Sequence, residues 1–207
     1  MTINQISLQE LTDLNDDLLL PWLDLYEISF PPNEKELVSS KLGLLKSKMA
    51  GEKSNKYMLA AIDQENSLVG LVNYQTTKDA NNAILWYLAV QPELRSKGFG
   101  SIIYREFTRS LNTNNIHALF FEVEIPELAH TAEEQDLARR RIEFYRRLGA
   151  KVLTGIHYLQ YIGPHLPPTP MHIMVQPFNA LEVQEIFNRA KGIFGDTLEQ
   201  VSDLDLA

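Results

Sequence analysis

The segment from Arg95 to Ser101 reads Arg-Ser-Lys-Gly-Phe-Gly-Ser and has the composition of a phosphate-binding turn. It follows the apolar run 84–90, which predicts a buried strand, and it precedes a helical pattern that includes Ile103 and Phe107. Glycines let a backbone close around an anion, and the first N–H groups of a helix are unpaired and partly positive. This order of strand, basic glycine turn and helix predicts a cradle for a phosphate or pyrophosphate.

The residue pattern of the turn excludes two common types of phosphate-binding loop. A dinucleotide-binding turn needs G-x-G-x-x-G, and Ile103 stands where the third glycine belongs. Phe120 and Phe121 stand where an acidic residue would hold a ribose. No G-x-x-x-x-G-K-[ST] run occurs in the sequence. What remains is R-x-x-G-x-G after a hydrophobic strand, which by itself also fits an ordinary surface turn.

Three segments in order resemble the GNAT superfamily of N-acyltransferases. The phrase 88–100 is similar to that family's acyl-CoA pyrophosphate loop, 119–124 to its next strand, and 144–150 to the F-Y-x-x-L-G-F element that ends its following helix. The resemblance covers about residues 56–176. It implies a mixed α/β single domain with a mostly antiparallel central sheet flanked by helices. It also implies direct transfer of an acetyl group from acetyl-CoA, or of another acyl group, to a primary amine.

The resemblance assigns the residues that would bind the co-substrate. The family's counterpart of Leu88, Ala89 and Val90 holds the pantetheine arm and meets the thioester carbonyl with main-chain groups. The pyrophosphate would be bound by the turn that follows, which consists of Arg95, Ser96, Lys97, Gly98, Phe99, Gly100 and Ser101.

Two side chains are candidates for the proton transfers that acyl transfer to an amine requires. Tyr145 matches the tyrosine that protonates the leaving thiolate in many relatives, although a packing tyrosine on the inner helix face is the alternative. Glu122 lies in a Phe-Glu-Val run that resembles the L-E-V of the ribosomal-protein alanine acetyltransferases, where the glutamate is the base. Strand alternation places Glu124 on the same face. An exposed carboxylate or an ion pair with an arginine remains the alternative for either glutamate.

The sequence departs from the family pattern in the next helix. Ala138 stands where relatives often carry an asparagine, seven places before Tyr145. Residues 139–141 are three arginines, which could contact cofactor phosphates or an acidic acceptor, or form a solvated helix face. These departures leave room for a rival function, a non-catalytic acyl-CoA-binding or sensing domain. The five histidines lack ligand spacing, so no metal is expected.

Composition narrows the class of protein. The chain has 207 residues, a net charge of −8 and no cysteine. The negative charge argues against nucleic acid as a partner, and the lack of cysteine excludes disulfides, thiolate metal sites and a cysteine nucleophile. The apolar run 18–23 is too short to span a bilayer, and no signal peptide is recognised. We expect a cytoplasmic enzyme with no membrane partner, a monomer or homodimer, acting on a small-molecule or peptide amine.

The hydrophobic patterns predict the remaining elements. Thr131 with Glu134, and Asn33 with Glu36, have the spacing of helix capping boxes, and Asn179 is the expected N-cap of a last helix. We expect strands at 3–8, 56–63, 68–76, 83–90, 117–125, 152–162 and 171–176, helices at 15–29, 34–49 and 131–148, and a proline-rich loop at 163–170.

Two further expectations concern the domain organisation and the acceptor site. Residues 1–178 would form the acyltransferase domain, and 179–207 would form a C-terminal helix packed on it, followed by an acidic, frayed tail from 201. The acceptor is expected between the 30–33 turn and the 163–170 loop, because binding residues often lie on loops held by a rigid scaffold.

Overall fold

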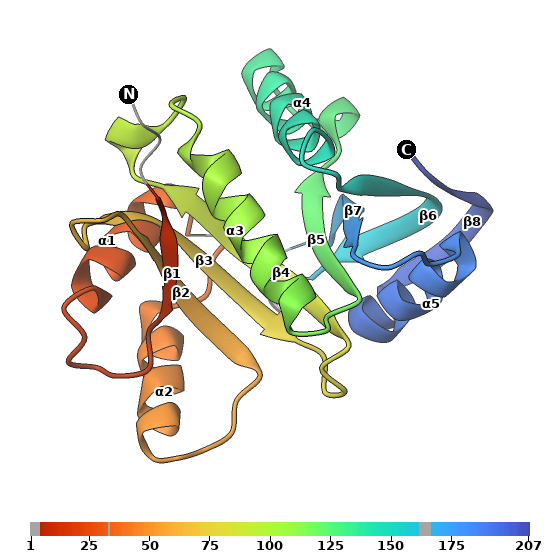
Figure 1. Cartoon of the computed structure of the whole chain (residues 1–207). Helices are drawn as coiled ribbons and strands as arrows, with labels where there is room; N and C mark the ends of the chain where they lie inside the picture. The colour runs from red at the N-terminus through yellow and green to blue at the C-terminus, as the bar shows by residue number, and fades with distance from the viewer. Residues whose placement is uncertain (1–4, 33, 162–166) are drawn as a thin grey trace. The chain divides into compact units, whose positions relative to one another are not determined.

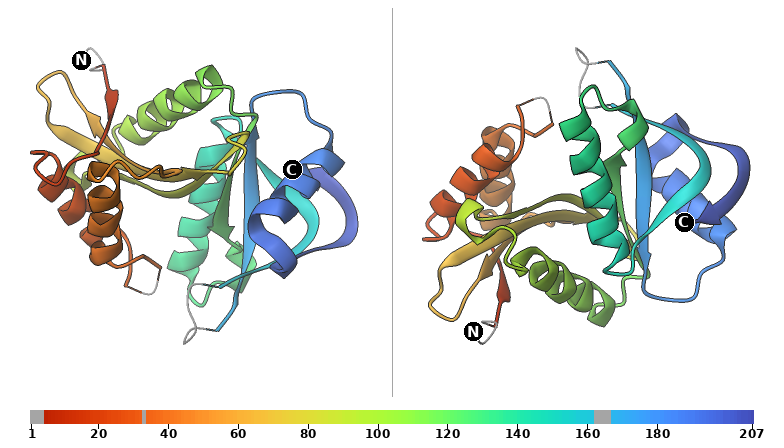
Figure 2. Two further views of the ribbon diagram at one scale, coloured as in Figure 1. Left: turned by 90° about the horizontal axis from the view of Figure 1, so that it is seen from below. Right: turned by 90° about the horizontal axis from the view of Figure 1, so that it is seen from above.

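The first half of the chain forms a compact unit, Met1–Asn115, built on four antiparallel strands (Figure 1). The computed structural model describes residues 5–32, 34–161 and 167–207. In this unit the strand order is β1-β2-β3-β4, with bounds Ser7–Glu10, Lys56–Ile62, Leu68–Thr76 and Asn82–Val90. Helices α1 (Leu19–Ser29) and α2 (Val38–Met49) cover one face, and α3 (Phe99–Thr113) covers the other (Figure 2).

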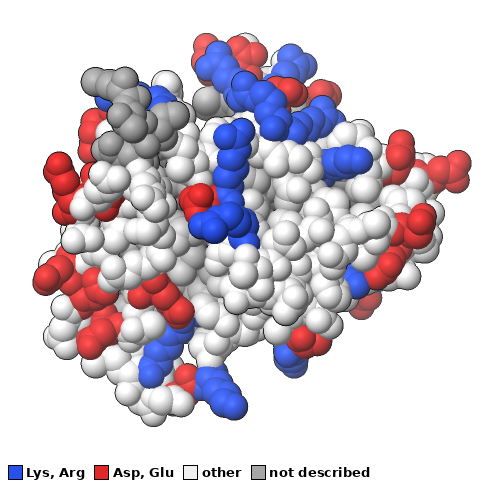
Figure 3. All heavy atoms as spheres, in the orientation of Figure 1, with Lys and Arg blue, Asp and Glu red and all other residues white. Residues whose placement is uncertain are grey.

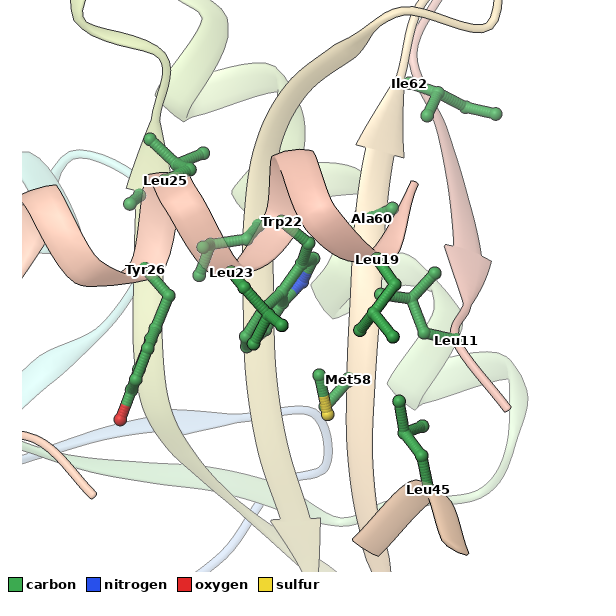
Figure 4. Packing of buried hydrophobic residues seen from close by; sticks show 12 residues of the cluster. Leu11, Leu19, Trp22, Leu23, Leu25, Tyr26, Leu45, Met58, Ala60 and Ile62 are labelled. Atoms are coloured by element: carbon green, nitrogen blue, oxygen red, sulfur yellow. The ribbon is translucent and has the colours of Figure 1, made fainter. Parts of the chain in front are cut away.

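The face under α1 and α2 holds the main core of this unit. Trp22 and Tyr26 are fully buried and stack with ring centroids 5.5 Å apart. The indole N–H of Trp22 donates a hydrogen bond to the carbonyl of Leu59 at 2.9 Å, so this buried polar atom is satisfied. Figure 4 shows Trp22 and Leu23 beside Met58 of β2. This packing fixes α1 on the sheet.

Gly70 brings β3, β4 and α3 close together. A Cβ at this position would lie 2.5 Å from the carbonyl oxygen of Ala89 and 2.6 Å from Cδ1 of Ile103. Only glycine permits both approaches. The start of α3 and the turn that precedes it are therefore held against the end of β4.

Strand β4 contains a bulge at Trp86. Asn73 pairs with Tyr87, but the next residue of β3, Tyr74, pairs with Leu85, so Trp86 is the extra residue. Its side chain is 42% exposed. The expectation that this run forms a buried strand is therefore wrong at Trp86.

The second unit, Ile116–Ala207, is built in the same way. Its strand order is β5-β7-β6-β8, with antiparallel pairing throughout and bounds Ala118–Glu124, Thr169–Pro177, Lys151–Gln160 and Leu198–Leu206. Helix α4 (Ala132–Arg146) lies over one face and α5 (Val183–Phe194) over the other (Figure 2). Ile186 and Ala190 of α5 are fully buried against β5, β6 and β7.

The C-terminal residues are not a frayed tail. They form β8, which pairs with β6, and Ala207 exchanges two backbone hydrogen bonds with Val152 at 2.8 and 3.0 Å. Gly155, with φ +79°, allows the close approach, since a Cβ there would lie 2.2 Å from the carbonyl oxygen of Asp203. The acidic side chains point outward while Leu198 is fully buried, which is the pattern of an edge strand.

The observed helix boundaries confirm some of the expected helices and correct others. The Thr131–Glu134 capping box is present, and Pro21 lies in the first turn of α1. Helix α2 begins at Val38 rather than 34, and α5 is capped at Glu182 rather than Asn179.

Some of the expected elements extend beyond the described residues. The first strand is 7–10 instead of 3–8, and residues 1–4 lie outside the described part of the chain. Asn33 and residues 162–166 of the proline-rich loop also lie outside it. Thr169 and Pro170, expected in that loop, begin β7, where proline is tolerated at a strand end.

Candidate active site

The turn before α3 has an anion-binding geometry. Ser96 and Gly98 both have left-handed backbone conformations, with φ of 60° and 88°, and Gly98 is the N-cap of α3. In the described part of the chain, the backbone N–H groups of residues 96–100 donate no hydrogen bond. A Cβ at Gly98 would meet nothing within 4 Å, so the space beside it is open. Unpaired N–H groups at a helix start suit a pyrophosphate.

The two cations of the turn have different surroundings. Arg95 donates from Nε to the carbonyl of Val90 at 3.0 Å and from Nη2 to Oγ of Ser29 at 3.3 Å. Arg95 therefore ties the turn to the ends of β4 and α1. Lys97 is exposed and forms no ion pair with any described residue. Of the two, Lys97 is the better placed to meet an anion.

The end of β4 presents main-chain groups away from β3. The bond from Gln91 N–H to the Val69 carbonyl makes Val90–Gly70 and Leu88–Val72 the non-hydrogen-bonded pairs of this ladder. The N–H and carbonyl groups of Leu88 and Val90 thus point to the side opposite β3. Main-chain recognition of an extended ligand arm, as expected for 88–90, uses groups of this kind.

Tyr145 lies on the inner face of α4 in the second unit. It is 9% exposed, and its ring packs against Phe121 of β5 with centroids 4.5 Å apart. Burial, opposed by Arg141 and reinforced by Glu124, raises the pKa of Tyr145 to about 12. Arg141 is itself ion-paired with Glu124. The phenol is therefore neutral at physiological pH and lies in the field of a charged pair.

Glu122 of β5 is hydrogen-bonded to two side chains of β6. The Tyr158 hydroxyl donates to Oε1, and Nε2 of Gln160 donates to Oε2 at 2.5 Å. Burial raises the pKa of Glu122 above its usual range, and the two hydrogen bonds oppose that rise. A carboxylate with a raised pKa is a better proton acceptor than a solvated one.

Glu122 and Tyr145 lie on opposite faces of β5. Phe121 points toward α4, where it meets Tyr145, whereas Phe120 is buried in the core under α5. Glu122 alternates with Phe121, and its partner Tyr158 packs on Phe194 of α5 at 5.1 Å. The structure thus places one candidate on each side of a single strand.

The two glutamates that alternation puts on one face have different partners. Glu124, near the end of β5, pairs with Arg141 of α4, and its other oxygen is buried without a hydrogen bond to any described residue. Glu122 instead contacts β6. Tyr158 and Gln160 were missed by sequence reasoning, because β6 reaches Glu122 across the intervening strand β7 and after a register shift. Ala138 is buried on α4.

Comparison with known proteins identifies the family. Residues 19–150, more than half of the chain, match the sequence model of the acetyltransferase (GNAT) family. The chain belongs to the GNAT family. It is thus an acetyltransferase, and membership of this family supports an enzyme over the binding-only alternative. No sequence among the curated proteins matches it.

Solved structures share the GNAT fold. A GNAT-family protein from Bacteroides thetaiotaomicron aligns with a TM-score of 0.70 and 21% identity, over 91% of this chain and 98% of the other. The spermidine/spermine N-acetyltransferase of Vibrio cholerae gives 0.58 and 18%, over 90% and 97%. A Bacillus subtilis acetyltransferase solved with CoA gives 0.54 and 13%, over 84% and 99%. The mixed α/β fold with mostly antiparallel strands is therefore confirmed.

Two properties of the described residues bear on other functions. They contain no group of three or more His, Cys, Asp and Glu side chains that could hold a metal ion. No helix within residues 5–32, 34–161 and 167–207 has the length and apolar character needed to cross a membrane.

GNAT enzymes use acyl-CoA and act on small-molecule or protein amines.

Proposed function

We propose that this GNAT enzyme transfers an acetyl group directly from acetyl-CoA to a primary amine. The observation that carries the proposal is the placement of Glu122 and Tyr145 on opposite faces of β5. Transfer forms a C–N bond, breaks the C–S bond and moves one proton from nitrogen to sulfur. One group can accept the proton of the amine from one side while the other serves the sulfur. With no cysteine in the chain, a cysteine thioester cannot form on the way.

The turn at 95–101 would hold the pyrophosphate of acetyl-CoA. Its open N–H groups, the two left-handed residues and the exposed ammonium of Lys97 all fit an anion. Arg95 would act by fixing the turn through Val90 and Ser29. Leu88, Ala89 and Val90 would hold the pantetheine arm through main-chain groups on the side opposite β3.

Glu122 would accept the amine proton, directly or through a water molecule. Its raised pKa makes it a better base than an exposed glutamate. Tyr158 and Gln160 would hold the carboxylate in one orientation, since each donates to a different oxygen. Tyr158 would not supply the base, because burial and the adjacent Glu122 raise the pKa of its hydroxyl.

Tyr145 would serve the leaving sulfur as a hydrogen-bond donor and acid. A thiol has a pKa of about 8.5, and Tyr145 has a pKa of about 12. Full proton transfer to the thiolate would thus be uphill by roughly 5 kcal/mol at 1.4 kcal/mol per unit. Without Arg141, which opposes the effect of burial, the pKa and this difference would be larger still. The hydrogen bond to the developing thiolate is the main expected contribution.

A binding experiment tests the co-substrate part of the proposal. Lys97→Ala removes one charge-assisted contact of roughly 1.5–3 kcal/mol, so calorimetry should show CoA binding weakened by tenfold or more. Gly98→Asp should weaken it further through backbone strain and like charge. Lys78→Ala, an exposed lysine in a distant turn of the same unit, is the control. Equal CoA affinity in all variants would remove the turn from the proposal.

A turnover experiment tests the reaction. Thiol release from acetyl-CoA is measured with a panel of polyamines, amino acids, aminoglycosides and peptide N-termini; the polyamine acceptor of the Vibrio cholerae relative makes that class the first choice. Mass spectrometry of the product should show one added acetyl group on nitrogen. CoA binding without turnover on any amine would favour an acyl-CoA sensor instead.

A further inference from the structure

A pocket lies entirely within the second unit, on the α4 face of its sheet. It has a volume of about 560 Å³ and lies between α4, the short helix Pro126–Leu128 and strands β6 and β7. We call it the α4 pocket. Its lining consists of Pro126, Glu127, Arg139, Arg140, Ile142, Glu143, Arg146, Val152, Thr154 and His172. None of these residues belongs to the turn at 95–101 or is Glu122 or Tyr145.

The α4 pocket combines an apolar floor with a basic rim. Pro126, Ile142 and Val152 are buried and supply the apolar surface. Arg139 and Arg146 lie two turns apart on one stripe of α4, so both guanidinium groups border the same hollow. A small-molecule site has this composition, a mostly apolar surface with a few polar groups that converge on it.

The arginine side chains on the rim of the pocket form only long, exposed ion pairs, or none, with described residues. The Nη2 atom of Arg139 lies 4.0 Å from Glu127, and that of Arg140 lies 3.9 Å from Asp136, with every side chain more than half exposed. Exposed pairs of this length contribute little. Arg146 forms no ion pair with any described residue. At least one guanidinium group is thus open to a ligand.

His172 marks the inner wall of the pocket. It lies on β7 and pairs with Val123, and both Glu127 and Arg146 act electrostatically on its ring. All three residues line the α4 pocket. Burial, opposed by Glu127 and reinforced by Arg146, lowers the pKa of His172, so its ring is a neutral hydrogen-bonding group at physiological pH.

The structure separates the arginines of α4 into two groups. Arg141 turns toward Glu124 and Tyr145, whereas Arg139, Arg140 and Arg146 border the α4 pocket. Figure 3 shows basic side chains, with acidic ones among them, gathered over α4. A solvated helix face explains exposed arginines but not the buried apolar floor that they surround.

We propose that the α4 pocket binds a small organic anion, with its apolar body on the floor and its carboxylate or phosphate held by Arg139 and Arg146. The planar guanidinium group matches both anions with paired hydrogen bonds. The volume lies in the range of small-molecule sites, about 300–1,000 Å³. Glu127 and Glu143 on the rim repel polyanions, so a single anionic group is the fitting charge.

Titration of the whole protein with benzoate and phenyl phosphate tests the proposal. Calorimetry or ligand-observed NMR should detect both anions, and should detect neither benzylamine, which reverses the charge, nor inorganic phosphate at comparable affinity, which lacks the apolar body. Arg146→Gln should weaken benzoate binding about tenfold, since a charge-assisted hydrogen bond is lost. Arg139→Gln should act in the same direction.

Arg147→Gln is the matched control, because Arg147 follows Arg146 in the chain but does not line the pocket. Glutamine keeps much of the side-chain length and is a good helix former, so the variants should fold. Equal benzoate affinity in wild type and Arg146→Gln would overturn the proposal, as would inorganic phosphate binding as tightly as phenyl phosphate.

The proposal is independent of acetyl transfer and fails separately from it. Lys97→Ala should leave benzoate affinity unchanged while weakening CoA, and Arg146→Gln should do the reverse. If benzoate binding is instead lost in Lys97→Ala and retained in Arg146→Gln, the anion binds at the turn before α3 and the α4 pocket is not a site.

Discussion

At the scale of single residues, the environment determines what two ordinary side chains can do. Glu122 is half-buried, and two neutral donors bind its oxygens instead of a cation. Tyr145 is buried against aromatic rings and lies near the Arg141–Glu124 pair. Without the surrounding strands and helices, both would titrate as they do in water. Their raised pKa values are consequences of burial.

Tyr145→Phe should lower kcat by about 100-fold or more, because the ring is kept and only the proton donor is lost. CoA affinity and the free energy of unfolding should change little, since the effect belongs to the transition state. Steady-state kinetics and calorimetry check this prediction. Tyr161→Phe, an exposed tyrosine of the same unit, is the control. An unchanged kcat would make Tyr145 a packing residue and solvent the proton source.

Glu122→Gln should change how stability depends on pH. The pKa of Glu122 is raised above 4.5 in the folded protein. The contribution of its protonation to the free energy of unfolding is therefore fully present below pH 4.5. The contribution is lost as pH rises through the folded-state pKa. The variant should therefore gain stability relative to wild type with rising pH and match it best in acid. Urea unfolding at several pH values measures the difference, and a pH-independent difference would contradict it.

The same variant should also change the pH–rate profile. Glu122→Gln should slow turnover most at the pH where wild type is fastest, and it should flatten the acidic limb, because the group that titrates there is gone. The measurement is kcat against pH with an accepted amine. A full acidic limb in the variant would assign the base to another group.

At the scale of elements, one close approach positions the turn at 95–101. Gly70 lets β3 lie against β4 while Ile103 of α3 fills the space above it. The turn at 95–101 joins β4 to α3, so its geometry depends on the distance between these two elements. Arg95 adds a tie to the end of α1.

Gly70→Ala should lower the free energy of unfolding by about 1–3 kcal/mol, the usual range for overpacking. It should also weaken CoA binding, because the added methyl meets a backbone oxygen 2.5 Å away and must displace β4 or α3. Gly43→Ala in α2, where nothing lies within 4 Å, is the control and should stabilise by up to about 1 kcal/mol. Denaturation and calorimetry on both variants decide the matter. Equal stability of the two variants would contradict the prediction.

At the scale of the whole molecule, the chain forms two compact units, each with helices on both faces of a sheet. In the second unit β8 covers one edge of β6, and Leu198 completes the core under α5. An uncovered edge strand invites pairing with other chains. The division into a domain of 1–178 with 179–207 packed on it stays a prediction, as does the cytoplasmic location.

Deletion of 198–207 should destabilise the second unit and promote aggregation, because it uncovers the edge of β6 and opens the core beneath Leu198. Thermal unfolding and light scattering measure both effects. Leu198→Ala should cost about 2–5 kcal/mol, the usual range for a buried leucine. Val201→Ala, at a 63% exposed position of the same strand, should cost far less. If the two substitutions have equal effects, β8 does not contribute to the core.

The sequence by itself determined the features that depend on neighbouring residues along the chain. These are the buried strand before the R-x-x-G-x-G turn, the helix after it and the capping box at Thr131, which rest on local hydrogen bonds and hydrophobic period. The family and its fold followed from three such segments in order.

Only the tertiary structure decided which distant residues meet. The bulge at Trp86 depends on how β4 pairs with β3. The strand formed by the acidic tail and the bonds of Tyr158 and Gln160 to Glu122 join segments far apart in the chain. The α4 pocket is of the same kind, since it draws on α4, β6 and β7. Strand pairing and burial arise from the packing of whole elements, and residue order and spacing alone do not specify that packing.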